Sequence, residues 1–147
     1  MIKGFHHAAI STPNLERCID FYTRVIGGEV AWTFGWDKGT PAADDVTGLS
    51  NSAARAAMLK IGATFLEVFE FSSPTAATQA ANRPVNNHGI THICLEVQDI
   101  GFEYERLKAA GMPFNCPPQQ QDGSAIVYGR DPDGNVVQAW GGPGHHP

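Results

Sequence analysis

Apolar and polar residues alternate over short stretches of this chain, and one longer early stretch follows a helical period. Residues 5–11 (FHHAAIS) alternate well enough to predict a strand. A helix is expected next, with Thr12 as its N-cap, a proline at its first position and its end at Gly27. Residues 29–35 are rich in β-branched and aromatic side chains, which favours a second strand. The expected apolar face of the helix consists of Leu15, Cys18, Ile19, Tyr22, Val25 and Ile26.

The pattern then changes to a polar stretch followed by two apolar runs. Residues 36–52 contain glycines and lack periodicity, so we expect a long loop in which Asp44 and Asp45 are solvated. Residues 53–61 and 64–71 are two strand-like runs separated by a Gly-Ala pair. Such a spacing predicts a hairpin.

After a linker over residues 73–88, the chain repeats itself. Residues 89–97 (GITHICLEV) resemble residues 4–10 (GFHHAAI), since in both a histidine is followed by three small or apolar positions. The two histidines, His7 and His92, lie 92 − 7 = 85 residues apart. The repeat indicates one structural unit used twice.

The second half keeps the order of the first. Asp99 is the expected cap of a helix that ends at Ala110 before a glycine. A poorly patterned stretch with a glutamine run follows, and then strands over residues 125–130 and 135–140 are joined by an Asp-Pro-Asp-Gly turn. The pattern predicts an α+β domain with an internal duplication. Its first module covers residues 1–72, its second 89–141, and a tail covers 142–147.

Composition narrows the class of protein. The 147 residues suit a single domain, and the scattered basic residues and net charge of −5 disfavour a nucleic-acid partner. Because no apolar run reaches the ~20 residues that a membrane helix needs, and the N-terminus lacks a signal-peptide core, we expect a cytoplasmic protein that does not enter membranes. Three cysteines without CxxC spacing are expected to be reduced thiols.

Five motifs in order, HHAAI, FYTRVIGGEV, FLEVFEF, GITHICLEV and DPDGNVVQAW, closely resemble the vicinal oxygen chelate superfamily, which groups glyoxalases, bleomycin-resistance proteins and dioxygenases. The resemblance covers about residues 5–140. It implies two βαβββ modules that form a curved, open mixed sheet around a central metal site. It also implies a homodimer, with the site built within one chain or across two.

The same resemblance implies the metal ligands, one from the first and one from the last strand of each module. Carried over by residue, these are His7 and Glu67 in the first module and His92 and Gln138 in the second. Two imidazoles, a carboxylate and an amide oxygen form a mixed set that suits one divalent ion such as Zn²⁺, Ni²⁺, Co²⁺, Mn²⁺ or Fe²⁺. His6 is the rival of His7, but alternation along the strand predicts that it points to the opposite face of the sheet.

Alternation also predicts the surroundings of the metal. Phe65 and Phe69 share the strand face of Glu67, and Trp140 shares that of Gln138, so these three rings are candidates for substrate binding. Arg55 lies within an otherwise small, apolar strand, either as a surface residue or as an anchor for a substrate carboxylate or phosphate. The aromatic residues at positions 32, 34 and 36 are expected in the core or in a pocket wall.

Gln138 constrains the chemistry, because most members of the family that move protons have a glutamate at this place. Since an amide cannot accept a proton, Glu67 is the candidate base. The leading hypothesis is therefore a metal-dependent isomerase, epimerase or lyase of glyoxalase type. It would transfer a proton next to a metal-chelated carbonyl of a small, fairly apolar substrate.

Two alternatives remain open. A ring-cleaving iron dioxygenase could use His7, His92 and Glu67 as a triad of two histidines and one carboxylate, although no second acid/base histidine is evident. A metal-free protein that binds and sequesters a drug or another small molecule, as in the bleomycin-resistance branch, would not need the ligand set that this chain retains.

Overall fold

The computed structural model describes residues 1–142, and the chain divides after Thr78 into two compact units. The first unit is Met1–Thr78 and the second begins at Gln79. Each unit contains one four-stranded sheet. The predicted tail falls almost wholly outside the described residues.

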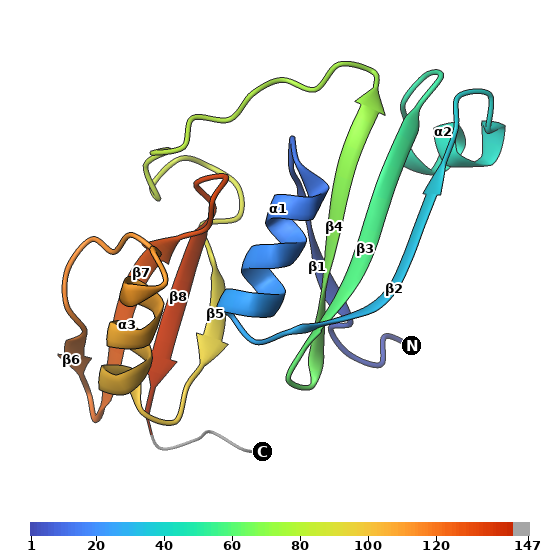
Figure 1. Cartoon of the computed structure of the whole chain (residues 1–147). Helices are drawn as coiled ribbons and strands as arrows, with labels where there is room; N and C mark the ends of the chain where they lie inside the picture. The colour runs from blue at the N-terminus through green and yellow to red at the C-terminus, as the bar shows by residue number, and fades with distance from the viewer. Residues whose placement is uncertain (143–147) are drawn as a thin grey trace. The chain divides into compact units, whose positions relative to one another are not determined.

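The first unit places its strands in an order that differs from their order along the chain (Figure 1). The sheet runs β1-β4-β3-β2, with β1 parallel to β4 and the other neighbours antiparallel. This arrangement confirms the predicted hairpin of β3 and β4. The elements are β1 (His7–Ser11), α1 (Leu15–Asp20), a π-helical continuation η1 (Phe21–Val25), β2 (Glu29–Trp36), α2 (Pro41–Thr47), β3 (Ala53–Ile61) and β4 (Thr64–Ser73).

The second unit has the same topology with shorter strands. Its sheet runs β5-β8-β7-β6, again with the first strand parallel to the last and the other neighbours antiparallel. The repeated order of strands confirms the α+β fold of two βαβββ modules. The elements are β5 (Ile93–Glu96), α3 (Ile100–Ala109), β6 (Gln119–Gln121), β7 (Ser124–Arg130) and β8 (Val136–Gly141).

The core of the first unit lies between its sheet and the early helix. α1 packs against β3 and β4, and Leu59 and Val68 on that face of the sheet are fully buried. Burial of each such side chain contributes roughly 1.5–3 kcal/mol. Because side chains alternate along a strand, Glu67 and its neighbours Phe65 and Phe69 point to the face away from the helix. The helical side of the core consists of Leu15, Cys18, Phe21, Tyr22 and Val25.

The second unit repeats this division of its sheet into two faces. α3 packs against β7 and β8, where Tyr104 contacts a buried cluster with Val127 and Ala139. The predicted cap is confirmed, since the Asp99 side chain accepts the N–H of Phe102 at 3.0 Å. Gln138 lies between buried neighbours on β8 and therefore belongs to the other face.

The first helix begins later than the sequence suggests. Asn14, and not Thr12, is its N-cap, because the Asn14 side chain accepts the N–H of Arg17 at 2.9 Å. Thr12 is buried, and its hydroxyl contacts the backbone of Asn14 at 3.2 Å. Thr12 and Asn14 thus form a turn before the helix.

The stretch predicted to be one long loop contains the helix α2. None of its residues is buried, so it has no apolar period that would reveal it. Asp44 is also not simply solvated, since its carboxylate accepts the N–H groups of Asn51 and Ser52 at 2.7 Å. The hydroxyl of Ser52 donates to the same carboxylate and lowers the pKa of Asp44. A left-handed Gly48 ends the helix.

Two boundaries in the second unit also differ from expectation. β5 begins at Ile93, so His92 directly precedes the strand instead of lying within it. β6 is formed by the glutamine run, whose three residues pair with β7. All three are exposed, and no alternation of polarity marks them as a strand.

Part of the linker is bound to the β7–β8 turn. Arg130 donates to the carbonyl oxygens of Gly134 at 2.7 Å and of Arg83 at 2.9 Å. Ala81 lies so close to Gly134 that a Cβ there would clash with the backbone of Ala81. This glycine is therefore required by packing as well as by its φ of +84°. Within residues 1–142, no helix has the length and apolar character of a membrane span.

Candidate metal and substrate site

His7 and Glu67 form a close pair in the first unit. His7 opens β1 and Glu67 lies in the middle of β4, the strand that pairs with β1. Nε2 of His7 is 3.3 Å from Oε2 of Glu67, and the two side chains are 35% and 16% exposed. A carboxylate on a largely apolar face needs a partner, and His7 is one that the fold supplies.

His6 lies beside this pair. The prediction that it points to the opposite face of the sheet, made from alternation along the strand, is therefore wrong. His6 precedes β1, so the alternation does not apply to it. Its ring stacks on that of Phe65, with centroids 5.3 Å apart. Its Nδ1 is 2.7 Å from Nδ1 of His7.

Aromatic rings cover the face of the sheet that carries Glu67. Rings from β2 meet rings from β4 above the alanines of β3, as in the pair Phe34 and Phe69 with centroids 5.8 Å apart. The alanine between them, Ala56, is 1% exposed, whereas Phe34 is 39% and Trp32 47% exposed. These residues are therefore a surface layer and not core. We call this set of six the aromatic face: Trp32, Phe34, Trp36, Phe65, Phe69 and Phe71.

The second unit holds the other predicted pair of ligands. The ring of His92 packs against that of Tyr128 with centroids 5.0 Å apart, and Tyr128 lies directly opposite Gln138 in the sheet. Nδ1 of His92 is 2.8 Å from the hydroxyl oxygen of Thr91. Trp140 follows Gln138 on the same face at half-buried depth.

The pairing register repeats between the units. In the first, Glu67 lies opposite Ala9, two residues after His7. In the second, Gln138 lies opposite Cys94, two residues after His92. Glu67 and Gln138 therefore occupy equivalent positions, as the duplication required.

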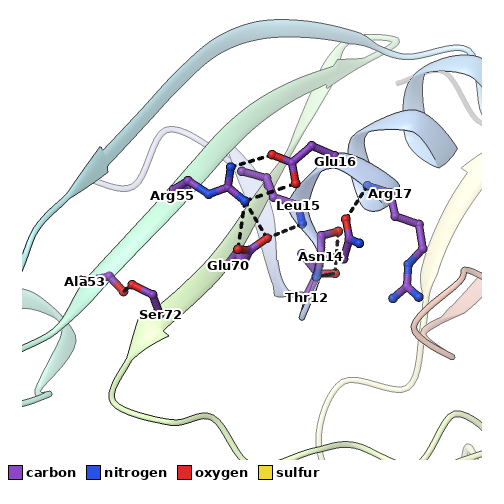
Figure 2. Close-up of polar contacts among 9 residues, drawn as sticks. All are labelled: Thr12, Asn14, Leu15, Glu16, Arg17, Ala53, Arg55, Glu70 and Ser72. Carbon is purple, nitrogen blue, oxygen red and sulfur yellow. Dashed lines mark hydrogen bonds and ion pairs between the residues drawn. The ribbon is translucent and has the colours of Figure 1, made fainter.

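Arg55 lies on the opposite face of the first sheet from Glu67. Its guanidinium donates to Glu16 at 2.6 Å and to Glu70 at 2.9 Å, and Glu70 also accepts the N–H of Leu15 at 2.6 Å (Figure 2). The hydrogen bond from Arg55 lowers the pKa of Glu16. Arg55 ties the start of α1 to the sheet, which favours the surface alternative over a substrate anchor. Glu70 is thus a paired surface charge on the face away from Glu67.

Three of these contacts could not be predicted from the sequence: Tyr128 with His92, His6 with His7 and Thr91 with His92. Tyr128 faces His92 because β7 pairs with β8 in a register that sets Tyr128 opposite Gln138, and a pattern along one strand does not give that register. The contacts of His6 and Thr91 with the next histidine depend on side-chain rotation, which periodicity does not report.

Known proteins share this arrangement of elements. The family model of the Glyoxalase/Bleomycin resistance protein/Dioxygenase superfamily matches residues 4–139, which include all four predicted ligands. The chain belongs to this superfamily. The resemblance seen in the motifs is thereby confirmed.

Two curated relatives within the superfamily are enzymes. The chain is 34% identical, over 109 residues and 71% of its length, to a 2-epi-5-epi-valiolone epimerase of an Actinomyces species, of which the match spans 57%. It is 25% identical over 142 residues, 91% of its length and 82% of the relative's, to a lactoylglutathione lyase of Pseudomonas putida. The crystal structure of a glyoxalase family protein from Bacillus cereus has a TM-score of 0.86, with 22% identity and coverage of 98% and 97%, which shows the common fold.

Members of this superfamily commonly use a divalent metal. In residues 1–142, neither unit by itself gathers three or more His, Cys, Asp or Glu side chains that could hold an ion. Each does carry a histidine and a side chain with an oxygen donor at equivalent positions. Nitrogen and oxygen donors of this kind fit a divalent transition metal.

Proposed function

We propose that this chain is a metal-dependent isomerase, epimerase or lyase of glyoxalase type. It would move a proton at the carbon next to a metal-chelated carbonyl of a small, fairly apolar substrate. The observation that carries the proposal is the His7–Glu67 pair, 3.3 Å apart on the aromatic face, with its counterpart in the same register of the second unit. The names of the two relatives, an epimerase and a lyase, support an enzyme.

His7, Glu67, His92 and Gln138 would hold the metal. When bound, such an ion supplies Lewis-acid polarisation of a substrate oxygen and stabilises the negative charge that forms there. The ligand set has one anionic member, so it leaves more positive charge on the ion than a set with two carboxylates would.

Glu67 is the group that would take and return the proton. Of the two equivalent positions, only Glu67 has a carboxylate, because Gln138 has no basic oxygen at neutral pH. Its exposed fraction of 16% keeps it largely out of water while leaving it accessible on the face. A base in such a position raises the rate of proton transfer by about 10²–10⁴.

The aromatic face would bind the apolar part of the substrate. Trp32 and Phe34 remain 47% and 39% exposed, although their rings offer large apolar areas. Phe65 and Phe69 flank Glu67 on the same strand. An apolar group stacked there would lie beside the base, which favours a substrate with an apolar or aromatic substituent.

Metal binding by the full chain tests this proposal. We expect about one Zn²⁺, Co²⁺ or Mn²⁺ ion per chain after metal-replete purification, since the four donors would form one site. His92→Ala should abolish binding, whereas His88→Ala, an exposed histidine of the linker, should bind as the unchanged chain does. Metal content below about half an ion per chain would contradict both enzyme hypotheses and favour a metal-free binding protein.

Proton transfer can be followed without knowing the natural substrate. The metal-loaded chain is incubated in D₂O with a panel of apolar and polar hydroxy ketones and hemithioacetals. We expect deuterium to enter next to the carbonyl, fastest with apolar substituents. Oxygen consumption with catechols, and no deuterium incorporation, would instead indicate the iron dioxygenase.

A further inference from the structure

Each candidate histidine ligand has its Nδ1 in contact with the residue directly before it. In the first unit, Nδ1 of His7 lies 2.7 Å from Nδ1 of His6. In the second, Nδ1 of His92 lies 2.8 Å from the hydroxyl oxygen of Thr91. The two preceding residues differ in chemistry, yet both can accept a hydrogen bond. The duplication has thus kept a contact while changing the group that makes it.

We infer that His6 and Thr91 are positioning residues, each of which accepts the Nδ1–H of the following histidine and leaves that histidine's Nε2 free to bind a metal. The inference rests on the metal site of the proposed function. A neutral imidazole carries one proton, so a hydrogen bond that keeps the proton on Nδ1 places the lone pair on Nε2. Partners of this kind fix both the tautomer and the orientation of ligating histidines.

The geometry around His7 supports this assignment. Nε2 points toward Glu67, which is 3.3 Å away, while Nδ1 points toward His6. With the proton on Nδ1, a lone pair and a carboxylate oxygen face each other, and a cation is the group that suits two such acceptors. His6 is itself held in place, because its ring stacks on Phe65 at an interplanar angle of 17°.

The opposite arrangement of protons makes a different prediction. If Nδ1 of His7 accepted a proton from His6, Nε2 would carry the proton and donate to Glu67. A metal could then not use Nε2. The protonated nitrogen in the metal-loaded chain therefore distinguishes the two arrangements.

The test measures the Zn²⁺ affinity of the full chain by competition with a chelator. His6→Phe keeps a ring over Phe65 but removes the acceptor, and Thr91→Val keeps the shape of threonine but removes the hydroxyl. We expect each to weaken binding by about tenfold, at the lower end of what loss of such a partner costs, and Thr91→Ser to bind within about twofold of the unchanged chain. A second acceptor at position 6, His6→Gln, should recover part of the affinity.

Nitrogen-15 NMR of the imidazole rings in the Zn²⁺-loaded chain gives an independent readout. We expect a proton on Nδ1 of both His7 and His92. Unchanged affinity in His6→Phe and Thr91→Val, or a proton on Nε2 of either loaded histidine, would overturn the inference. If the unchanged chain binds no metal, the proposed function fails together with the inference. If the unchanged chain binds metal and the His6→Phe and Thr91→Val variants bind it equally well, the inference alone fails.

Discussion

The two units have the same topology and pairing register but differ in the surroundings of their candidate ligands. In the first, His7 meets a carboxylate on a face covered by six aromatic rings. In the second, His92 packs on Tyr128, and an amide, Gln138, stands where the carboxylate would be. Both units keep the histidine. They differ in the last strand of the unit, where β4 has Glu67 and β8 has Gln138. Under the proposed function, the metal ligands come from both units, whereas the base and the apolar contacts come from the first.

Removal of the carboxylate should have the largest effect. Glu67→Gln makes the two units alike at this position and leaves no base, so deuterium incorporation should fall by about 10²–10⁴, the usual contribution of a positioned base. The measurement is the exchange rate of the best carbonyl compound with metal at saturation.

Glu70→Gln is the matched control, since Glu70 lies three residues further along β4 on the helix side. It should exchange deuterium at the rate of the unchanged chain. An undiminished rate in Glu67→Gln would show that the base lies elsewhere and that the difference between the units is not catalytic.

The second prediction tests whether each unit is held by its own core. Leu59 is fully buried against the first helix, and Leu59→Ala should lower the free energy of unfolding by about 2–5 kcal/mol, as cavities of this kind do. Hydrogen exchange should show lost protection in β3 and β4 but not in β7 and β8.

Leu107→Ala, at a buried position of α3, should give the reverse pattern. Equal loss of protection in both units from either variant would mean that the two cores unfold as one.

The features that could be predicted are those marked by the internal repeat or by the periodicity of apolar residues. The second module and its order of elements could be expected, because the segment around His92 repeats the segment around His7. The alternation around Glu67 placed Phe65 and Phe69 on its face, and the structure agrees. These features follow from the sequence repeat and from the alternation of side chains along a strand, both of which the order of residues records directly.

The parts that escaped prediction depend on local hydrogen bonds instead of burial. α2 and β6 have no buried residues, so no apolar pattern marks them. Thr12 and Asn14 are both good capping residues and lie two positions apart, so the sequence alone does not decide between them. The backbone turn before the helix makes Asn14 the N-cap. The carboxylates that bind Arg55 belong to Glu16 and Glu70, which are 39 and 15 residues away in the sequence. A local sequence pattern does not reveal pairs so far apart.

The third prediction concerns the reverse substitution, which makes the two units alike by adding a carboxylate instead of removing one. Gln138→Glu gives both units a carboxylate, and we expect metal affinity to rise by about tenfold, because a unit charge near a cation gains up to about 4 kcal/mol at a protein surface, less its desolvation. Chelator competition measures the change. Unaltered affinity would mean that position 138 does not face the metal.

The smallest effect is expected in α2, which the first unit has and the second lacks. Hydrogen bonds from Ser52 and Asn51 hold the pKa of Asp44 below its ordinary value of 3.8. A lowered pKa in the folded chain stabilises it above the unfolded value, and this stabilisation disappears as pH falls through the folded pKa. Asp44→Asn should therefore lower the midpoint of thermal unfolding slightly at pH 7, and the difference from the unchanged chain should shrink below about pH 4. Asp45→Asn, at the exposed neighbouring position, should show no such pH-dependent difference; an equal effect in both variants would assign it to net charge and not to the contacts of Asp44.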